Sequence, residues 1–86
     1  MVIIKITGWV RTLPLMITFG SPTDITVEEL KVVAQAYTGV RRGTYSLRAR
    51  LENGGLVPVQ QSSIVGSLPM NEGKIQLEPT WNGKEF

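Results

Sequence analysis

The chain of 86 residues contains no cysteine and no histidine, and both absences restrict the chemistry available to it. Without cysteine it can form neither disulfides nor thiolate metal sites, so packing alone must hold its core. Without histidine it lacks the side chain that most often transfers protons near neutral pH. We therefore expect no enzyme, no metal site and no cofactor.

Long apolar runs and concentrated charge are also missing. No stretch approaches the roughly 20 apolar residues that a membrane span needs. The regular alternation from Met1 to Gly8, with Lys5 inside it, is unlike a signal peptide. The net charge of +2 is mild and spread along the chain, so it does not by itself indicate nucleic acid. We expect one small cytoplasmic domain with no membrane partner.

One helix is predicted over residues 27–38. Thr26 is a suitable N-cap, Glu29 completes a capping box with it, and Gly39 is a natural stop. Apolar residues recur with helical period and predict the buried face, which would consist of Val27, Leu30, Ala34 and Tyr37 with Val33 beside them.

Alternating patterns predict strands before and after this helix. The first two would cover residues 2–7 and 15–19, with an interruption over residues 8–12 and Pro14 at the start of the second. Later strands would cover residues 45–51, 56–59 and 74–78, the last ended by Pro79. Between the last two strands, four apolar residues are expected to be buried in the core, namely Ile64, Val65, Leu68 and Met70. This order predicts an α+β fold, a mixed sheet of four to five strands with one helix across one face.

The opening hairpin, the helix start Thr26–Lys31 and the segment Ser63–Leu77 together resemble ubiquitin and its relatives over essentially the whole chain. The stretch Arg48–Leu77 is also similar to the small ubiquitin-like proteins of bacterial type VII secretion systems. The resemblance implies a β-grasp domain over residues 1–79 and a flexible tail over residues 80–86. It implies much less about function, because β-grasp domains serve as tags, sulfur carriers, adaptors and enzyme subunits.

The tail resembles that of bacterial ubiquitin-like modifiers, in which a C-terminal glycine is joined to target proteins. That resemblance implies a peptidase that cuts between Gly83 and Lys84, and activating and conjugating enzymes that use the new carboxylate of Gly83. The tail departs from the pattern, since Asn82 replaces a second glycine and Thr80 stands where many activating enzymes read arginine. The same residues have a second interpretation that involves no processing. Asn82-Gly83 is a strong hairpin-turn signal, so this dipeptide would simply fold the tail back.

Partner-binding residues are predicted on one strand face and at the two tryptophans. Arg48 and Arg50 would point outward from the sheet, where they suit carboxylates or phosphates or else form a solvated face. Trp9 and Trp81 are candidates for an interface or for covering core edges.

These residues also fit functions other than conjugation. One alternative is a non-conjugated interaction module, such as a secretion accessory or an assembly subunit. Another, which the mild charge supports poorly, is nucleic-acid binding through a cluster of arginines, Arg41, Arg42, Arg48 and Arg50.

Overall fold

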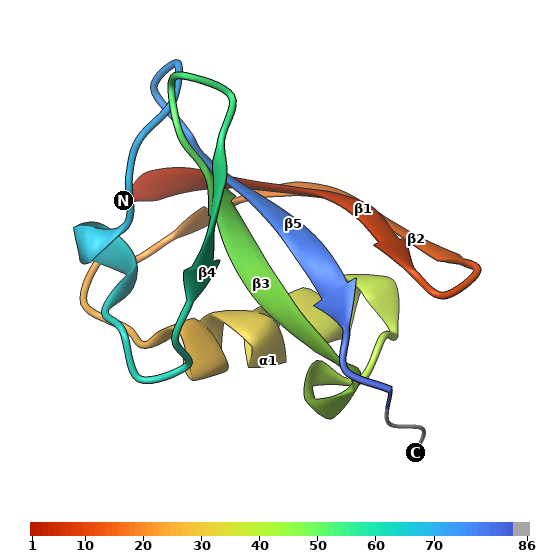
Figure 1. Cartoon of the computed structure of the whole chain (residues 1–86). Helices are drawn as coiled ribbons and strands as arrows, with labels where there is room; N and C mark the ends of the chain where they lie inside the picture. Colours follow the sequence, from red (N-terminus) through yellow and green to blue (C-terminus); the bar gives the residue numbers. More distant parts are fainter. Residues whose placement is uncertain (84–86) are drawn as a thin grey trace.

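The computed structural model describes residues 1–83 and contains a five-stranded sheet with α1 (Val27–Thr38) across one face (Figure 1). The strand order is β2-β1-β5-β3-β4. β1 and β5 are parallel, whereas the other neighbouring pairs are antiparallel, so the sheet is mixed. This confirms the predicted α+β class, and the arrangement is consistent with a β-grasp-like fold. The strands are β1 (Val2–Val10), β2 (Leu13–Ser21), β3 (Tyr45–Arg50), β4 (Leu56–Val59) and β5 (Ile75–Trp81).

Local signals set both ends of α1, as predicted. The backbone N–H of Glu29 donates to the Thr26 hydroxyl at 3.2 Å, and the Glu29 carboxylate accepts from the Thr26 N–H at 3.2 Å. Gly39 ends the helix with φ of +74°, and its N–H donates to the carbonyl of Gln35. Glycine reaches this left-handed conformation without a steric penalty, which explains why the helix stops there.

The buried face of α1 is rotated from the predicted one. Val27, Leu30 and Ala34 are buried as expected, but Tyr37 is 68% exposed, so its predicted place in the core is wrong. Val33 is exposed as well, and Lys31 is buried instead. At about 100° per residue, positions 27, 30, 31 and 34 form one continuous stripe. The predicted stripe did not include Lys31, which is charged and so was not counted among the apolar residues that defined it.

The β1–β2 hairpin is longer than the sequence indicates. The predicted interruption over residues 8–12 is wrong, since β1 continues to Val10 and a two-residue turn of Arg11 and Thr12 leads into β2. The parallel ladder between β1 and β5 ends at Leu77, and the rest of the hairpin extends away from β3 and β4 (Figure 1). A Cβ on Gly8 would lie 2.7 Å from Cδ of Pro79, so only glycine fits where the two strands part.

β5 continues beyond the point where the sequence ended it. The prediction that Pro79 stops this strand is wrong, because Pro79 lies inside β5 and is opposite Leu47 of β3. Proline lacks an N–H, but the ladder to β1 has already ended there, so no bond of that ladder is lost. The expected domain boundary at residue 79 therefore falls within a strand.

The core lies between the sheet and α1 and is closed at its ends by irregular segments. Two short 3₁₀ turns, η1 (Arg42–Thr44) and η2 (Val65–Ser67), belong to these segments. Val65 and Leu68 are buried as predicted. Ile64 and Met70 are 44% and 45% exposed, so the prediction that these two residues lie in the core is wrong. Within residues 1–83 no helix is long and apolar enough to cross a membrane.

Candidate partner-binding surface and C-terminal segment

The sheet face opposite α1, here called the outer face, carries three of the four predicted partner-binding residues. On β1 and β3 the core residues Ile6 and Leu47 point toward the helix. Because side chains alternate along a strand, Trp9, Arg48 and Arg50 point the other way. The structure thus brings these residues onto one surface, although they lie on strands that are far apart in the sequence.

Cations outnumber carboxylates on the outer face of β1, β3 and β5. Arg50 forms an ion pair with Glu78 and donates from Nη1 to the carbonyl of Gly54 at 2.9 Å. Arg48 is opposite Glu78 in the strand register, and its Nε is buried without a hydrogen-bond partner among residues 1–83. Lys5 is on the same face two strands away and pairs with the uncharged Gln76. Glu78 therefore leaves positive charge uncompensated on this surface.

An apolar cluster lies on the same face as these cations, on the part of the hairpin beyond the end of the β1–β5 ladder. Trp9 is 63% exposed and Met16 is 78% exposed, and Pro14 is opposite Trp9 in the register. Trp9, Pro14 and Met16 together form what we call the hairpin patch. Met16 is opposite Thr7, so it is diagonal to Trp9, a separation that large side chains bridge. Single exposed apolar residues are common on protein surfaces, but a cluster on one face is typical of an interaction site.

The fourth predicted partner-binding residue, Trp81, is not on the outer face. It is opposite Tyr45 at the end of β5, on the face of the sheet that carries α1. Its side chain is 41% exposed, and the guanidinium carbon of Arg11 lies 4.7 Å from the ring centroid. Since Trp9 is on the outer face, one flat partner surface cannot contact both tryptophans.

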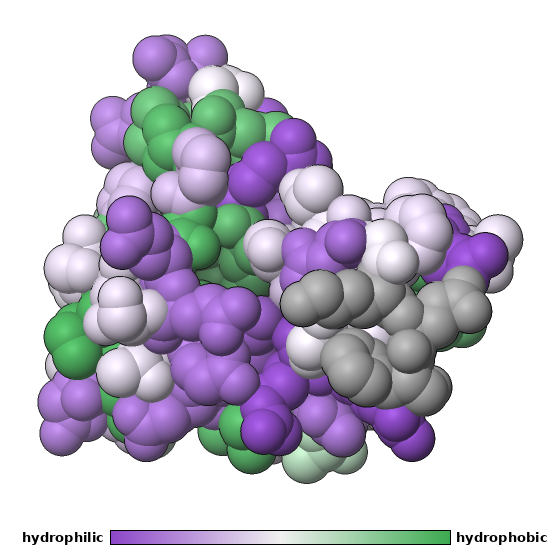
Figure 2. Space-filling view, turned by 60° about the horizontal axis from the view of Figure 1, so that its bottom comes forward, coloured by the Kyte–Doolittle hydropathy of each residue, from purple (hydrophilic) through white to green (hydrophobic). Residues whose placement is uncertain are grey.

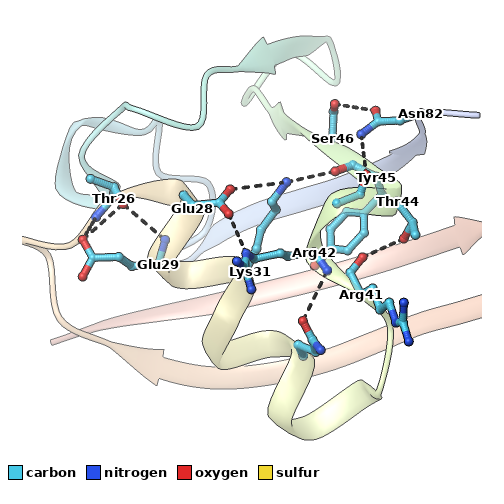
Figure 3. Close-up of polar contacts among 12 residues, drawn as sticks. Thr26, Glu28, Glu29, Lys31, Arg41, Arg42, Thr44, Tyr45, Ser46 and Asn82 are labelled. Atoms are coloured by element: carbon cyan, nitrogen blue, oxygen red, sulfur yellow. Dashed lines mark hydrogen bonds and ion pairs between the residues drawn. The ribbon is translucent and has the colours of Figure 1, made fainter. Parts of the chain in front are cut away.

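The segment after β5 is held against the domain. The N–H of Asn82 donates to the carbonyl of Thr44 at 2.9 Å, and its side-chain oxygen accepts from the Ser46 hydroxyl at 2.7 Å (Figure 3). Its side-chain nitrogen lies 3.4 Å from the carbonyl of Gly43, which it approaches as a donor. Gly83 follows with φ of +80° and is exposed, and no atom of residues 1–81 lies within 4 Å of the position of a Cβ on it. The predicted processing partner, Lys84, lies outside the described residues.

A polar constellation on the α1 side of the molecule was not predicted from the sequence. The Lys31 ammonium is buried, donates to the carbonyl of Tyr45 at 3.0 Å, and lies 4.0 Å from the Glu28 carboxylate (Figure 3). Arg42 donates from Nε to the same carboxylate at 2.7 Å. The only signal in the sequence was Lys31 itself, which stands at a core position of the helical repeat.

Burial dominates the electrostatics of this constellation. It lowers the pKa of Lys31 below its usual 10.5, with Arg42 acting in the same direction and Glu28 opposing it. Burial also raises the pKa of Tyr45 to about 12, and the negative charge of Glu28 adds to that effect. The Tyr45 hydroxyl has no hydrogen-bond partner within residues 1–83.

A pocket of about 280 Å³ opens beside these residues, between α1 and η1. It is lined by Glu28, Gln35, Arg41, Arg42, Gly43 and Gln61. Figure 2 shows this side of the molecule, where hydrophilic surface covers the middle of the view.

No model of a known protein family matches the chain, and no curated protein is significantly similar to it in sequence. The similarity to ubiquitin-like proteins therefore stays a prediction from sequence patterns, alongside a fold consistent with it.

Proposed function

We propose that the chain is a non-conjugated interaction module that binds an acidic protein through the outer face of its sheet. The observation that carries this proposal is that the hairpin patch shares the outer face with the positive charge of β1 and β3. Trp9 and Met16 expose apolar surface to water, where a partner can bury it. Aromatic anchors of this kind dominate the binding energy of many interfaces.

Charge complementarity defines the partner. Lys5, Arg48 and Arg50 face outward, with Glu78 as the compensating carboxylate on β5. An arginine fork suits carboxylates, so a segment that combines acidic residues with an apolar side chain fits this surface. Such a module acts as a secretion accessory or as a subunit of a larger assembly, and we place its action in the cytoplasm.

The test is quantitative capture of partners from the native host with two matched variants. Trp9→Ala removes the anchor of the hairpin patch, and we expect at least about tenfold less of an acidic partner to be captured. Leu13→Ala is the control, because Leu13 is 57% exposed on the opposite face of the same hairpin. Capture of the same proteins in equal amounts by both variants would reject the outer face as the binding surface.

A second candidate function is the one that the tail resembles, a ubiquitin-like modifier processed after Gly83. Its support is the exposure of Gly83 one residue beyond the last strand, with no atom of residues 1–81 within 4 Å of a Cβ placed on it. An activating enzyme and a conjugating enzyme would then use its carboxylate, and a peptidase would remove the residues that follow. The anchoring of Asn82 weighs against this candidate, since only Asn82 separates Gly83 from the end of β5.

Intact mass of the protein from its native host separates the two candidates. A protein that ends at Phe86, without heavier conjugates, is expected for the interaction module. A protein that lacks residues 84–86, together with conjugates that disappear in Gly83→Ala, would establish the modifier instead. A Cβ at Gly83 would meet no atom of residues 1–81 within 4 Å, but the φ of +80° makes alanine there mildly strained, so folding of this variant is checked by circular dichroism.

A further inference from the structure

We propose that the pocket between α1 and η1 binds a phosphate group, as the free ion or as a phosphate monoester. The pocket is on the α1 side of the sheet, so this site is separate from the outer face and does not depend on the function proposed above. Its volume of about 280 Å³ is at the lower end of ligand pockets, which suits a small group.

The pocket wall is rich in hydrogen-bond donors. Arg42 uses Nε on Glu28, so the other nitrogens of its guanidinium group stay available. Gln35 accepts through Oε1 from the N–H of Arg42 at 3.4 Å, which leaves its amide nitrogen to donate. Arg41 is exposed and makes no ion pair with a carboxylate of residues 1–83. Arginine and amide donors are the groups that hold phosphate oxygens in proteins.

The charge balance around the pocket favours an anion. Glu28 is the carboxylate of the wall, and its charge is shared by Arg42 at 2.7 Å and by Lys31 at 4.0 Å. Lys31 is buried and cannot turn toward water to find another counter-ion. Because one carboxylate serves two cations and Arg41 adds a third, the site carries a surplus of positive charge that a phosphate dianion would neutralise.

The elements around the pocket hold these donors in place. The N–H of Glu28 donates to the carbonyl of Gln61 at 3.1 Å, which ties the segment after β4 to the first turn of α1. The N–H of Thr44 donates to the carbonyl of Arg41 at 3.1 Å, which closes η1. The pocket is therefore walled by a helix, a 3₁₀ turn and a loop, and its donors come from α1 and from the segment of Arg41 and Arg42. A tetrahedral group presents oxygens in several directions and matches this arrangement better than a planar carboxylate does.

The experiment is a titration of the full chain with inorganic phosphate, followed by NMR at constant ionic strength so that general screening does not change. We expect saturable shifts of the Gly43 amide and of the Gln35 side-chain amide. Arg41→Gln should weaken binding by about tenfold, the loss expected for one charge-assisted hydrogen bond. Lys74→Gln is the control, because it removes one exposed positive charge that does not line the pocket and should leave the affinity unchanged.

Three results would overturn the proposal. The first is the absence of saturable shifts at these residues. The second is an equal affinity loss in Arg41→Gln and Lys74→Gln, which would reduce the effect to net charge. The third is acetate binding as tightly as phosphate, which would reject the assignment to a tetrahedral anion. Tighter binding of phenyl phosphate than of inorganic phosphate would identify a monoester as the source of the group, and equal binding would identify the free ion.

Discussion

Replacing Tyr45 by phenylalanine should stabilise this protein, although it removes a polar group from the centre of the fold. The Tyr45 side chain is fully buried, and its hydroxyl has no hydrogen-bond partner among residues 1–83. A buried hydroxyl without a partner costs about 1–3 kcal/mol of stability. The Lys31 ammonium contacts the backbone carbonyl of Tyr45 and lies 5.1 Å from the centroid of its ring, and phenylalanine retains both the carbonyl and an aromatic ring. Since phenylalanine also fills the space of the ring, we expect a gain of about 1 kcal/mol.

The same substitution should change how stability depends on pH. The pKa of Tyr45 is about 12 in the folded protein against its ordinary value of 10.0 in the unfolded chain, so the folded state keeps its proton where the unfolded state loses it. The wild type is therefore unaffected below about pH 10 and loses stability as the pH rises toward 12. The loss is about 1.4 kcal/mol near pH 11. The Tyr45→Phe variant has no such group, so its advantage should grow by that amount.

Urea unfolding of both proteins near pH 7 and near pH 11 measures these differences. Near pH 7 the expected gain corresponds to a melting temperature about 4–8 °C higher, on the scale typical of domains this size. Tyr37→Phe is the control, because Tyr37 is 68% exposed and is expected to change stability by less than about 0.5 kcal/mol. A Tyr45→Phe variant that is less stable than wild type near pH 7 would show that the hydroxyl has a partner and refute the reasoning.

Three further outcomes follow from contacts in the structure. Gly8→Ala should lower the free energy of unfolding by about 2 kcal/mol, because its Cβ would lie 2.7 Å from Cδ of Pro79. In urea unfolding this loss should be larger than that of Gly73→Ala, where no atom lies within 4 Å of the new Cβ among the described residues beyond its chain neighbours. Equal losses in the two variants would contradict the clash. Burial lowers the pKa of Lys31 in the folded state, so just below pH 10.5 the unfolded state binds more protons and the free energy of unfolding of the wild type rises with pH. Lys31→Met should abolish this rise. Parallel pH profiles of unfolding free energy for the wild type and the variant would disprove the lowering. Asn82→Ala should speed amide exchange at residue 82 about fivefold, measured by NMR, and an unchanged rate would mean that the side chain anchors nothing.

The helix shows how far local sequence signals reach. The capping box of Thr26 and Glu29 and the stop at Gly39 involve residues close together in the chain, so their geometry follows from the sequence alone. The buried face could not be derived in the same way. Lys31 is buried because the carbonyl of Tyr45 and the carboxylate of Glu28 receive its ammonium, and the first of these comes from another element of the fold.

The candidate surfaces show the same difference between what local sequence patterns predict and what the tertiary structure adds. Alternation placed Arg48 and Arg50 on one strand face, and the structure agrees with that placement. Only the continuation of β1 through Gly8 and of β5 through Pro79 puts Trp9 on the same face and Trp81 on the other. The pocket between α1 and η1 unites residues from the helix, the turn and a distant loop, so no spacing in the sequence indicates it.

The sequence by itself determined the identity and order of the elements, because hydrophobic period, caps and turns act over a few residues. The tertiary structure alone decided where β1 and β5 end. Proline was expected to stop β5, yet the strand passes through Pro79 because Gly8 lets β1 approach it closely and no ladder bond is needed there. It also decided that Asn82 is tied to β3 and η1. Such choices depend on which backbone groups meet across the fold, and that is a property of the packed chain rather than of any segment.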